Sequence, residues 1–124
     1  MSTRAYINVK RKDGLVYSSY LHFDGHLAFE TLQQHYNSQD LAEALSNFGD
    51  MSSLGKYINS KGNTHSFANP EPDICVFYGR DRGETYTCAT PYISFEACRN
   101  DKNALMGIEF IYEWDGVSWT QIPL

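Results

Sequence analysis

Two pairs of alternating apolar and polar runs, each joined by an Asp-Gly dipeptide, constrain the fold of this sequence more than any other feature. Residues 4–11 (RAYINVKR) and 15–23 (LVYSSYLHF) flank Asp13-Gly14, and residues 107–114 (GIEFIYEW) and 117–122 (VSWTQI) flank Asp115-Gly116. A period of two is typical of β-strands, and Asp-Gly between two such runs is a strong signal for a β-hairpin. The sequence therefore predicts an antiparallel hairpin near each end of the chain.

Between the hairpins, the spacing of apolar residues changes to that of a helix. Residues 27–36 (LAFETLQQHY) carry apolar side chains at helical spacing, which predicts a first helix. A second helix is expected to begin near Ser38, a good N-cap residue, and to end at Gly49, which suits the C′ position. Residues 51–55 (MSSLG) are typical of one more helical turn.

The second half of the chain predicts shorter elements. Residues 59–73 are expected to form a loop that contains two prolines, and residues 74–79 (ICVFYG) a central strand followed by a turn at 80–84. Residues 85–93 (TYTCATPYI) are a candidate strand, which Pro91 would end or place at an edge of the sheet. Ser94 is expected to cap a short helix.

This order of elements favours one α+β domain over residues 1–124. Hairpins at both ends imply a mainly antiparallel sheet, with two or three helices packed on one face. Apolar residues make up 42% of the 124 residues, which is enough for one hydrophobic core.

Charge and hydropathy disfavour several classes of protein. Fifteen acidic and ten basic residues give a net charge of -5, whereas general nucleic-acid binding needs a basic surface, so no direct nucleic-acid partner is expected. The apolar runs are too short to cross a membrane and residues 1–12 lack the apolar region of a secretion signal, so we expect a cytoplasmic protein. Three cysteines without C-x-x-C spacing indicate reduced thiols.

A first candidate site lies at the end of the second expected strand. His22, Asp24 and His26 would share one face of a strand, and imidazole and carboxylate groups bind zinc, manganese or iron. The alternative is that Asp24-Gly25 forms a turn and Asp24 caps the following helix, so that the three side chains do not converge. Because no fourth ligand or fixed spacing accompanies them, we assign no metal and no cofactor.

A second candidate site is the charged segment after the predicted central strand. Arg80, Asp81, Arg82 and Glu84 follow it, and an arginine fork suits a carboxylate or a phosphate, so one interpretation is anion recognition. The interpretation that we favour is structural: the arginines pair with these acids, while the flanking glycines supply unusual backbone angles. The segment lacks the glycine spacing and the helix start of a phosphate loop.

The C-terminal hairpin offers a third candidate surface. Tyr112 and Trp114 share one face of a strand, and Trp119 follows on the next strand. If these aromatic side chains are exposed, they mark a contact with a partner protein. If they are buried, they are part of the core.

Seven motifs spread over nearly the whole chain resemble those of one protein family. They are TRAYI, YLHFDG, QQHY, LSNFGDMSSLG, HSFANP, FYGRDRGE and DGVSW. The pattern resembles a family of small bacteriophage and prophage proteins, for which it implies neither a catalytic mechanism nor a ligand. This chain departs from the family pattern after Glu84, where the pattern has a more polar and acidic stretch.

The resemblance and the charge together give three expectations for function. The first is a phage-encoded, non-enzymatic protein that binds and inhibits a host protein or ribonucleoprotein complex, such as a CRISPR effector, through an acidic and aromatic-rich surface. The alternative is a small enzyme or an anion- or metal-binding protein with a site around His22, Asp24 and the turn from Arg80 to Glu84. A third expectation is an assembly protein of the phage that forms a homodimer through a sheet edge.

Overall fold

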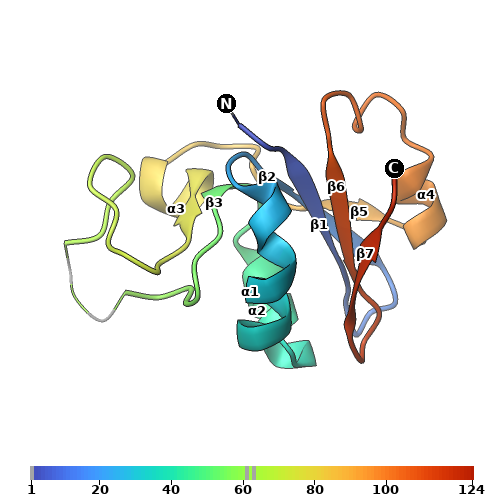
Figure 1. The fold of residues 1–124 in the computed structure, drawn as a ribbon, viewed down its shortest axis with the longest axis horizontal. Helices are drawn as coiled ribbons and strands as arrows, with labels where there is room; N and C mark the ends of the chain where they lie inside the picture. Colours follow the sequence, from blue (N-terminus) through green and yellow to red (C-terminus); the bar gives the residue numbers. More distant parts are fainter. Residues whose placement is uncertain (1, 61, 63) are drawn as a thin grey trace.

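Both predicted hairpins are present, and they meet in the middle of one sheet (Figure 1). The computed structural model describes residues 2–60, 62 and 64–124. β1 (Ala5–Lys10) and β2 (Val16–Leu21) form the first antiparallel pair, and β6 (Phe110–Trp114) and β7 (Trp119–Ile122) form the second. β1 also lies parallel to β6, with Ile7 opposite Tyr112, and this pairing joins the two hairpins.

The sheet is completed by three short strands beyond the first hairpin. They are β3 (Met51–Ser53), β4 (Val76–Phe77) and β5 (Thr90–Tyr92). Within the described residues the order is β4-β3-β2-β1-β6-β7, and β5 pairs with the same edge of β2 as β3 does. The β1–β6 and β2–β3 pairs are parallel and the other four pairs are antiparallel. The predicted α+β fold is therefore confirmed, with a mixed sheet.

One face of the sheet is covered by the helices that the sequence predicts in the first half of the chain. η1 (Gly25–Leu27) leads into α1 (Ala28–His35), and α2 (Gln39–Asn47) follows. The Ser38 hydroxyl accepts a hydrogen bond from the amide of Leu41, and Gly49 follows α2 with a φ of 76°, as both local signals predict. Burial of a Leu or Ile side chain in this core contributes about 1.5–3 kcal/mol.

α4 (Phe95–Arg99) packs on the second face of the sheet. Glu113 alternates along β6 with Tyr112 and Trp114, so its side chain points to the opposite face, where Arg99 of α4 binds it through a charged hydrogen bond. Figure 1 shows α1 and α2 on one side of the β1–β6 pair and α4 on the other side. The Ser94 hydroxyl accepts a hydrogen bond from Ala97, which confirms the predicted cap of α4.

Three predictions about local structure are wrong. Residues 51–53 form β3 instead of a helical turn, because Met51 pairs with both Leu21 and Phe77 and is fully buried. β4 is an edge strand of two residues, not a central strand. The charged segment begins as a one-turn helix, α3 (Tyr78–Arg82), which ends at Gly83 with a φ of 75°. For β3, pairing with distant segments outweighs the local preference, whereas α3 is closed by local hydrogen bonds from Gly83 to Gly79 and from Glu84 to Tyr78.

Candidate functional site

Arg80 holds the charged segment against two neighbouring parts of the chain. Its Nη1 donates to the carbonyl of Ile58 at 2.5 Å and its Nη2 to the carbonyl of Cys75 at 3.0 Å. Its Nε donates to Oδ1 of Asp81 at 2.9 Å, and the guanidinium lies 4.9 Å from the centre of the Phe77 ring. Every nitrogen of this fork has an internal partner, so the arrangement fits the structural interpretation of Arg80 and leaves little for an external anion.

Asp81 is the buried acceptor at the centre of this arrangement. It accepts a hydrogen bond from the amide of Phe77 at 2.8 Å, and Nε2 of His65 lies 3.4 Å from its Oδ2. Burial pushes the pKa of Asp81 upward, but the hydrogen bonds from Arg80 and Phe77 outweigh burial and leave the pKa below its usual value. The carboxylate therefore stays ionised because it is fully bonded inside the protein.

His65 is the member of this group that the sequence did not connect to Asp81. Its Nδ1 accepts a hydrogen bond from the amide of Glu71 at 3.0 Å, so Nδ1 carries no proton and the proton of the neutral ring is on Nε2, facing Asp81. An imidazole with Nδ1 occupied by an amide cannot act as a general base through that nitrogen. The Glu71 amide therefore joins the two ends of the 65–71 loop through His65, while Nε2 faces Asp81 at 3.4 Å without a hydrogen bond.

Arg82 and Glu84 lie at the surface and pair with each other. Nε of Arg82 is 3.5 Å from Oε2 of Glu84, and the guanidinium lies 4.8 Å from the centre of the Phe67 ring. Both side chains are about half exposed, so this pair contributes no more than about 1 kcal/mol. The acid partners expected for the two arginines are thus both present.

His22 and Asp24 do not form a site with this segment. Nδ1 of His22 lies 2.6 Å from the hydroxyl of Tyr20. Asp24 takes the N-cap position of η1, as the turn alternative expects, but with a left-handed φ of 57° and without a side-chain cap hydrogen bond. Asp24 lines one hollow and Arg80 another, and the two hollows share no residue. Across residues 2–60, 62 and 64–124, no three His, Cys, Asp or Glu side chains gather as ligands for a metal ion.

The aromatic residues of the C-terminal hairpin belong to the core. Tyr112 is 0% and Trp114 1% exposed, so neither side chain is available to a partner. The Tyr112 hydroxyl donates to the carbonyl of Gly25 at 2.6 Å, and Nε1 of Trp114 donates to Oε1 of Gln39 at 2.7 Å. Both polar tips are satisfied internally, which is what buried Tyr and Trp require. The core interpretation of this surface is confirmed.

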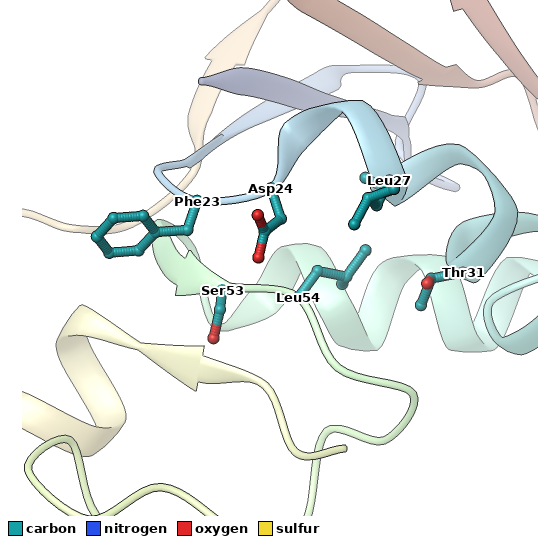
Figure 2. A pocket seen from close by; sticks show the side chains of 7 residues that line it. Phe23, Asp24, Leu27, Thr31, Ser53 and Leu54 are labelled. Atoms are coloured by element: carbon teal, nitrogen blue, oxygen red, sulfur yellow. The ribbon is translucent and has the colours of Figure 1, made fainter. Parts of the chain in front are cut away.

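A different surface, which we call the α1 groove, runs from η1 and the start of α1 along residues 53–57 and 70–74. Its first hollow has a volume of about 170 Å³ and lies between η1, α1 and the end of β3 (Figure 2). Asp24 and Leu27 line it on one side and Ser53 and Leu54 on the other. A second hollow of about 400 Å³ shares Ser53 and Leu54 with the first and extends along residues 70–74, and a third of about 310 Å³ continues to Tyr57.

Backbone hydrogen bonds fix the shape of the α1 groove. The amide of Tyr57 donates to the carbonyl of Asp73, and the amide of Cys75 donates to the carbonyl of Tyr57, both at 3.0 Å. A Cβ atom at Gly55 would lie 2.5 Å from the carbonyl oxygen of Asp73, so only glycine permits this close approach of the two segments. The groove is therefore formed before any ligand binds.

The α1 groove carries both exposed apolar side chains and charge. Phe23 is 45%, Leu27 61% and Tyr57 54% exposed, whereas such side chains are more often buried. The charged residues that line the three hollows are Asp24, Lys56, Glu71 and Asp73. Exposed apolar side chains with a charged rim are typical of a binding surface. Of the candidate site residues predicted from the sequence, only Asp24 lines this surface.

A half-buried acid lies apart from the α1 groove. Oδ1 of Asp50 accepts a hydrogen bond from the amide of Tyr20 at 2.9 Å. Burial raises the pKa of Asp50 to about 6, although this hydrogen bond acts in the opposite direction. Tyr20 also contacts Tyr6 edge to face, with ring centres 6.1 Å apart. The raised pKa is a property of local burial, and no described hollow includes Asp50.

The fold and the groove define a small α+β domain with a preformed, partly apolar surface. No family model, no curated protein and no solved structure matches the chain. Among the helices of the described residues, none combines the length and the apolar character needed to cross a membrane.

Proposed function

We propose that this chain is a phage-encoded, non-enzymatic binding protein that inhibits or modulates a host protein complex in the host cytoplasm. The observation that carries the proposal is the contrast between two regions. Arg80 and Asp81 are hydrogen-bonded to each other and to the backbone, and the buried side chain of His65 accepts a backbone hydrogen bond, whereas apolar side chains of the α1 groove are exposed.

The internal bonding of the charged segment favours binding over catalysis. A catalytic acid or base needs a free position within hydrogen-bond reach of a substrate. The fork of Arg80 has partners at Ile58, Cys75 and Asp81, and Nδ1 of His65 has the Glu71 amide. The enzyme alternative also requires His22 and Asp24 beside Arg80, and the hollow lined by Arg80 contains neither.

The net charge of -5 agrees with a partner that has a basic surface. Many host complexes that handle nucleic acid carry such surfaces, and an acidic binder associates with them rapidly and in a salt-sensitive manner. An inhibitor of a CRISPR effector or of another defence system is one member of this class, and the resemblance to phage proteins supports it. The host complex would supply the basic partner surface.

The test is capture of the tagged chain from phage-infected host cells, followed by reconstitution of each captured complex from purified components. We expect one host complex to bind in a fixed stoichiometry, to lose its activity, and to dissociate as salt is raised. A phage without the gene should grow less well only in a host that contains this complex. Capture of phage structural proteins alone, with unchanged growth of the deletion phage, would refute the proposal and favour an assembly role.

A further inference from the structure

We infer that the α1 groove binds a cationic segment of the partner protein, which places an apolar side chain in the hollow between Leu27 and Leu54 and Lys or Arg side chains beside Asp24 and Asp73. The inference rests on the proposed binding function and names the site and the chemistry of its ligand. It depends on the size of the hollow, on the exposed apolar side chains and on the charge of the rim.

The first hollow has the size of one apolar side chain and a lining that combines apolar and polar groups. Its volume of about 170 Å³ is close to the volume of about 150 Å³ that accommodates benzene in an apolar protein cavity. Leu27, Ala28 and Leu54 supply apolar lining, and Figure 2 shows Leu27 and Leu54 extending toward each other across it. Leu27 is 61% exposed, so a ligand would remove apolar surface from water that folding leaves exposed.

The charge on the rim of the α1 groove complements a cation. Asp24 and Asp73 are exposed, and among the described residues neither takes part in an ion pair. Four other acidic residues of the described part of the chain do form ion pairs, with lysine, arginine or histidine: Asp40, Asp81, Glu84 and Glu113. Among the described residues, three acidic residues and one lysine line the three hollows. This balance attracts Lys and Arg and repels phosphate groups.

The backbone holds the two rim acids in unusual conformations. Asp24 has a φ of 57° and Asp73 a φ of 65°, which Asp and Asn tolerate better than most other residues. The backbone of Asp73 is also bonded to Tyr57. Substitution of either acid by Asn therefore removes the charge and preserves the backbone preference, which gives a clean test of the electrostatic contribution.

A second copy of this chain fits the α1 groove less well than a basic partner. Two copies each carry a charge of -5, so their acidic rims repel each other. Nucleic acid is disfavoured for the same reason. A cationic protein segment with an apolar side chain is the ligand that both the partly apolar hollow and the acidic rim favour.

The test uses fluorescently labelled peptides and the intact chain. The probe is an eight-residue peptide of alternating Lys and Leu, and its controls replace every Lys by Glu or every Leu by Ser. Fluorescence anisotropy at 0.15 M salt should detect the Lys/Leu peptide, with weaker binding of the Lys/Ser peptide and none of the Glu/Leu peptide. Amide chemical shifts should change along the α1 groove.

Two variants and their matched controls separate specific from general attraction. D24N/D73N should weaken peptide binding about three- to tenfold, as expected for two exposed ion pairs. L27Q should weaken it about tenfold through lost apolar contact. The control E96Q/E109Q removes two exposed acids outside the α1 groove, and the control V117Q removes an exposed apolar side chain in the β6–β7 turn. Neither control should change peptide binding more than twofold.

Several results would overturn the inference. Equal losses in D24N/D73N and E96Q/E109Q would show general attraction to an acidic protein. Self-association of the chain that L27Q abolishes would show that a second copy occupies the groove. If the reconstituted host complex binds D24N/D73N and L27Q as tightly as the unmodified chain, the binding function stands and the groove is wrong. If the peptide binds at the groove and no host complex is captured, the groove stands and the proposed function is wrong.

Discussion

Substitution of Asp50 by Asn is expected to make the protein more stable at neutral pH, and this effect should disappear in acid. Asp50 is half buried, and burial raises its pKa from 3.8 to about 6. In the unfolded chain the same carboxyl ionises near its ordinary value. The folded protein therefore holds the proton more tightly, so its stability falls as the pH rises from about 4 through 6 and is constant above that range.

The size of the effect follows from the pKa difference. A shift from 3.8 to about 6 corresponds to about 3 kcal/mol for a fully desolvated carboxylate, at 1.36 kcal/mol for each pH unit. Asp50 is partly open to water, which screens the charge, so we expect about 1–1.5 kcal/mol. The Asn side chain keeps an oxygen that can accept the hydrogen bond from the Tyr20 amide. The free energy of unfolding of D50N should therefore exceed that of the parent protein by about 1–1.5 kcal/mol at pH 7.5, and the two should be about equal at pH 4.

Urea unfolding, followed by the fluorescence of the two buried tryptophans, measures the free energy of unfolding at both pH values. E109Q is the matched control, because Glu109 is exposed and takes part in none of the ion pairs among the described residues, so this variant tests the loss of one charge alone. A D50N protein that is less stable than the parent at pH 7.5 would contradict the expected cost of burial. An equal difference at pH 4 and 7.5 would show that the effect does not come from ionisation.

Two further predictions compare neighbouring positions with similar chemistry. R80A should lower the free energy of unfolding by about 3 kcal/mol, because it leaves the buried Asp81 carboxylate without its cation, whereas R82A at the surface should cost less than about 1 kcal/mol. The same urea assay checks both, and a similar loss for the two would contradict the structural role of Arg80. G49A should destabilise more than G83A, since both positions have left-handed φ angles but a Cβ atom at Gly49 would collide with the Thr87 backbone and one at Gly83 meets open space. Equal thermal midpoints for these two variants would refute that reasoning.

The parts of the fold that the sequence predicts are those that short-range physics determines. An Asp-Gly dipeptide between alternating runs specifies a hairpin within about fifteen residues, and Ser38 and Gly49 specify the ends of α2 through their own side chain and backbone. The parallel contact between β1 and β6 joins residues more than one hundred positions apart, and no local pattern encodes it. β3 was mistaken for a helical turn for the same reason, since Met51 is extended only because Leu21 and Phe77 lie on either side of it.

In the candidate sites too, contacts between residues close in the sequence are predictable and contacts between distant residues are not. Arg80 and Asp81 are adjacent in sequence, so their pairing was predictable, whereas His65 reaches Asp81 from sixteen residues away through a loop whose path is not predictable. Tyr112 and Trp114 were correctly given a core alternative, because a strand face alone does not say whether it meets a helix or water.

The α1 groove left one trace in the sequence that the prediction of α1 did not use. The buried positions of α1 are Ala28 and Leu32, and Tyr36 continues the same stripe at a spacing of four residues. Leu27 lies outside this stripe. The residues that follow it at a spacing of four are Thr31 and His35, and neither of them is buried. An apolar residue beside a polar face of an amphipathic helix has no place in the core, so its exposure is predictable even where its neighbours are not. The sequence does not predict the wall of the α1 groove that lies opposite Leu27. Leu54 and Asp73 form this wall only because two backbone segments approach each other closely at Gly55.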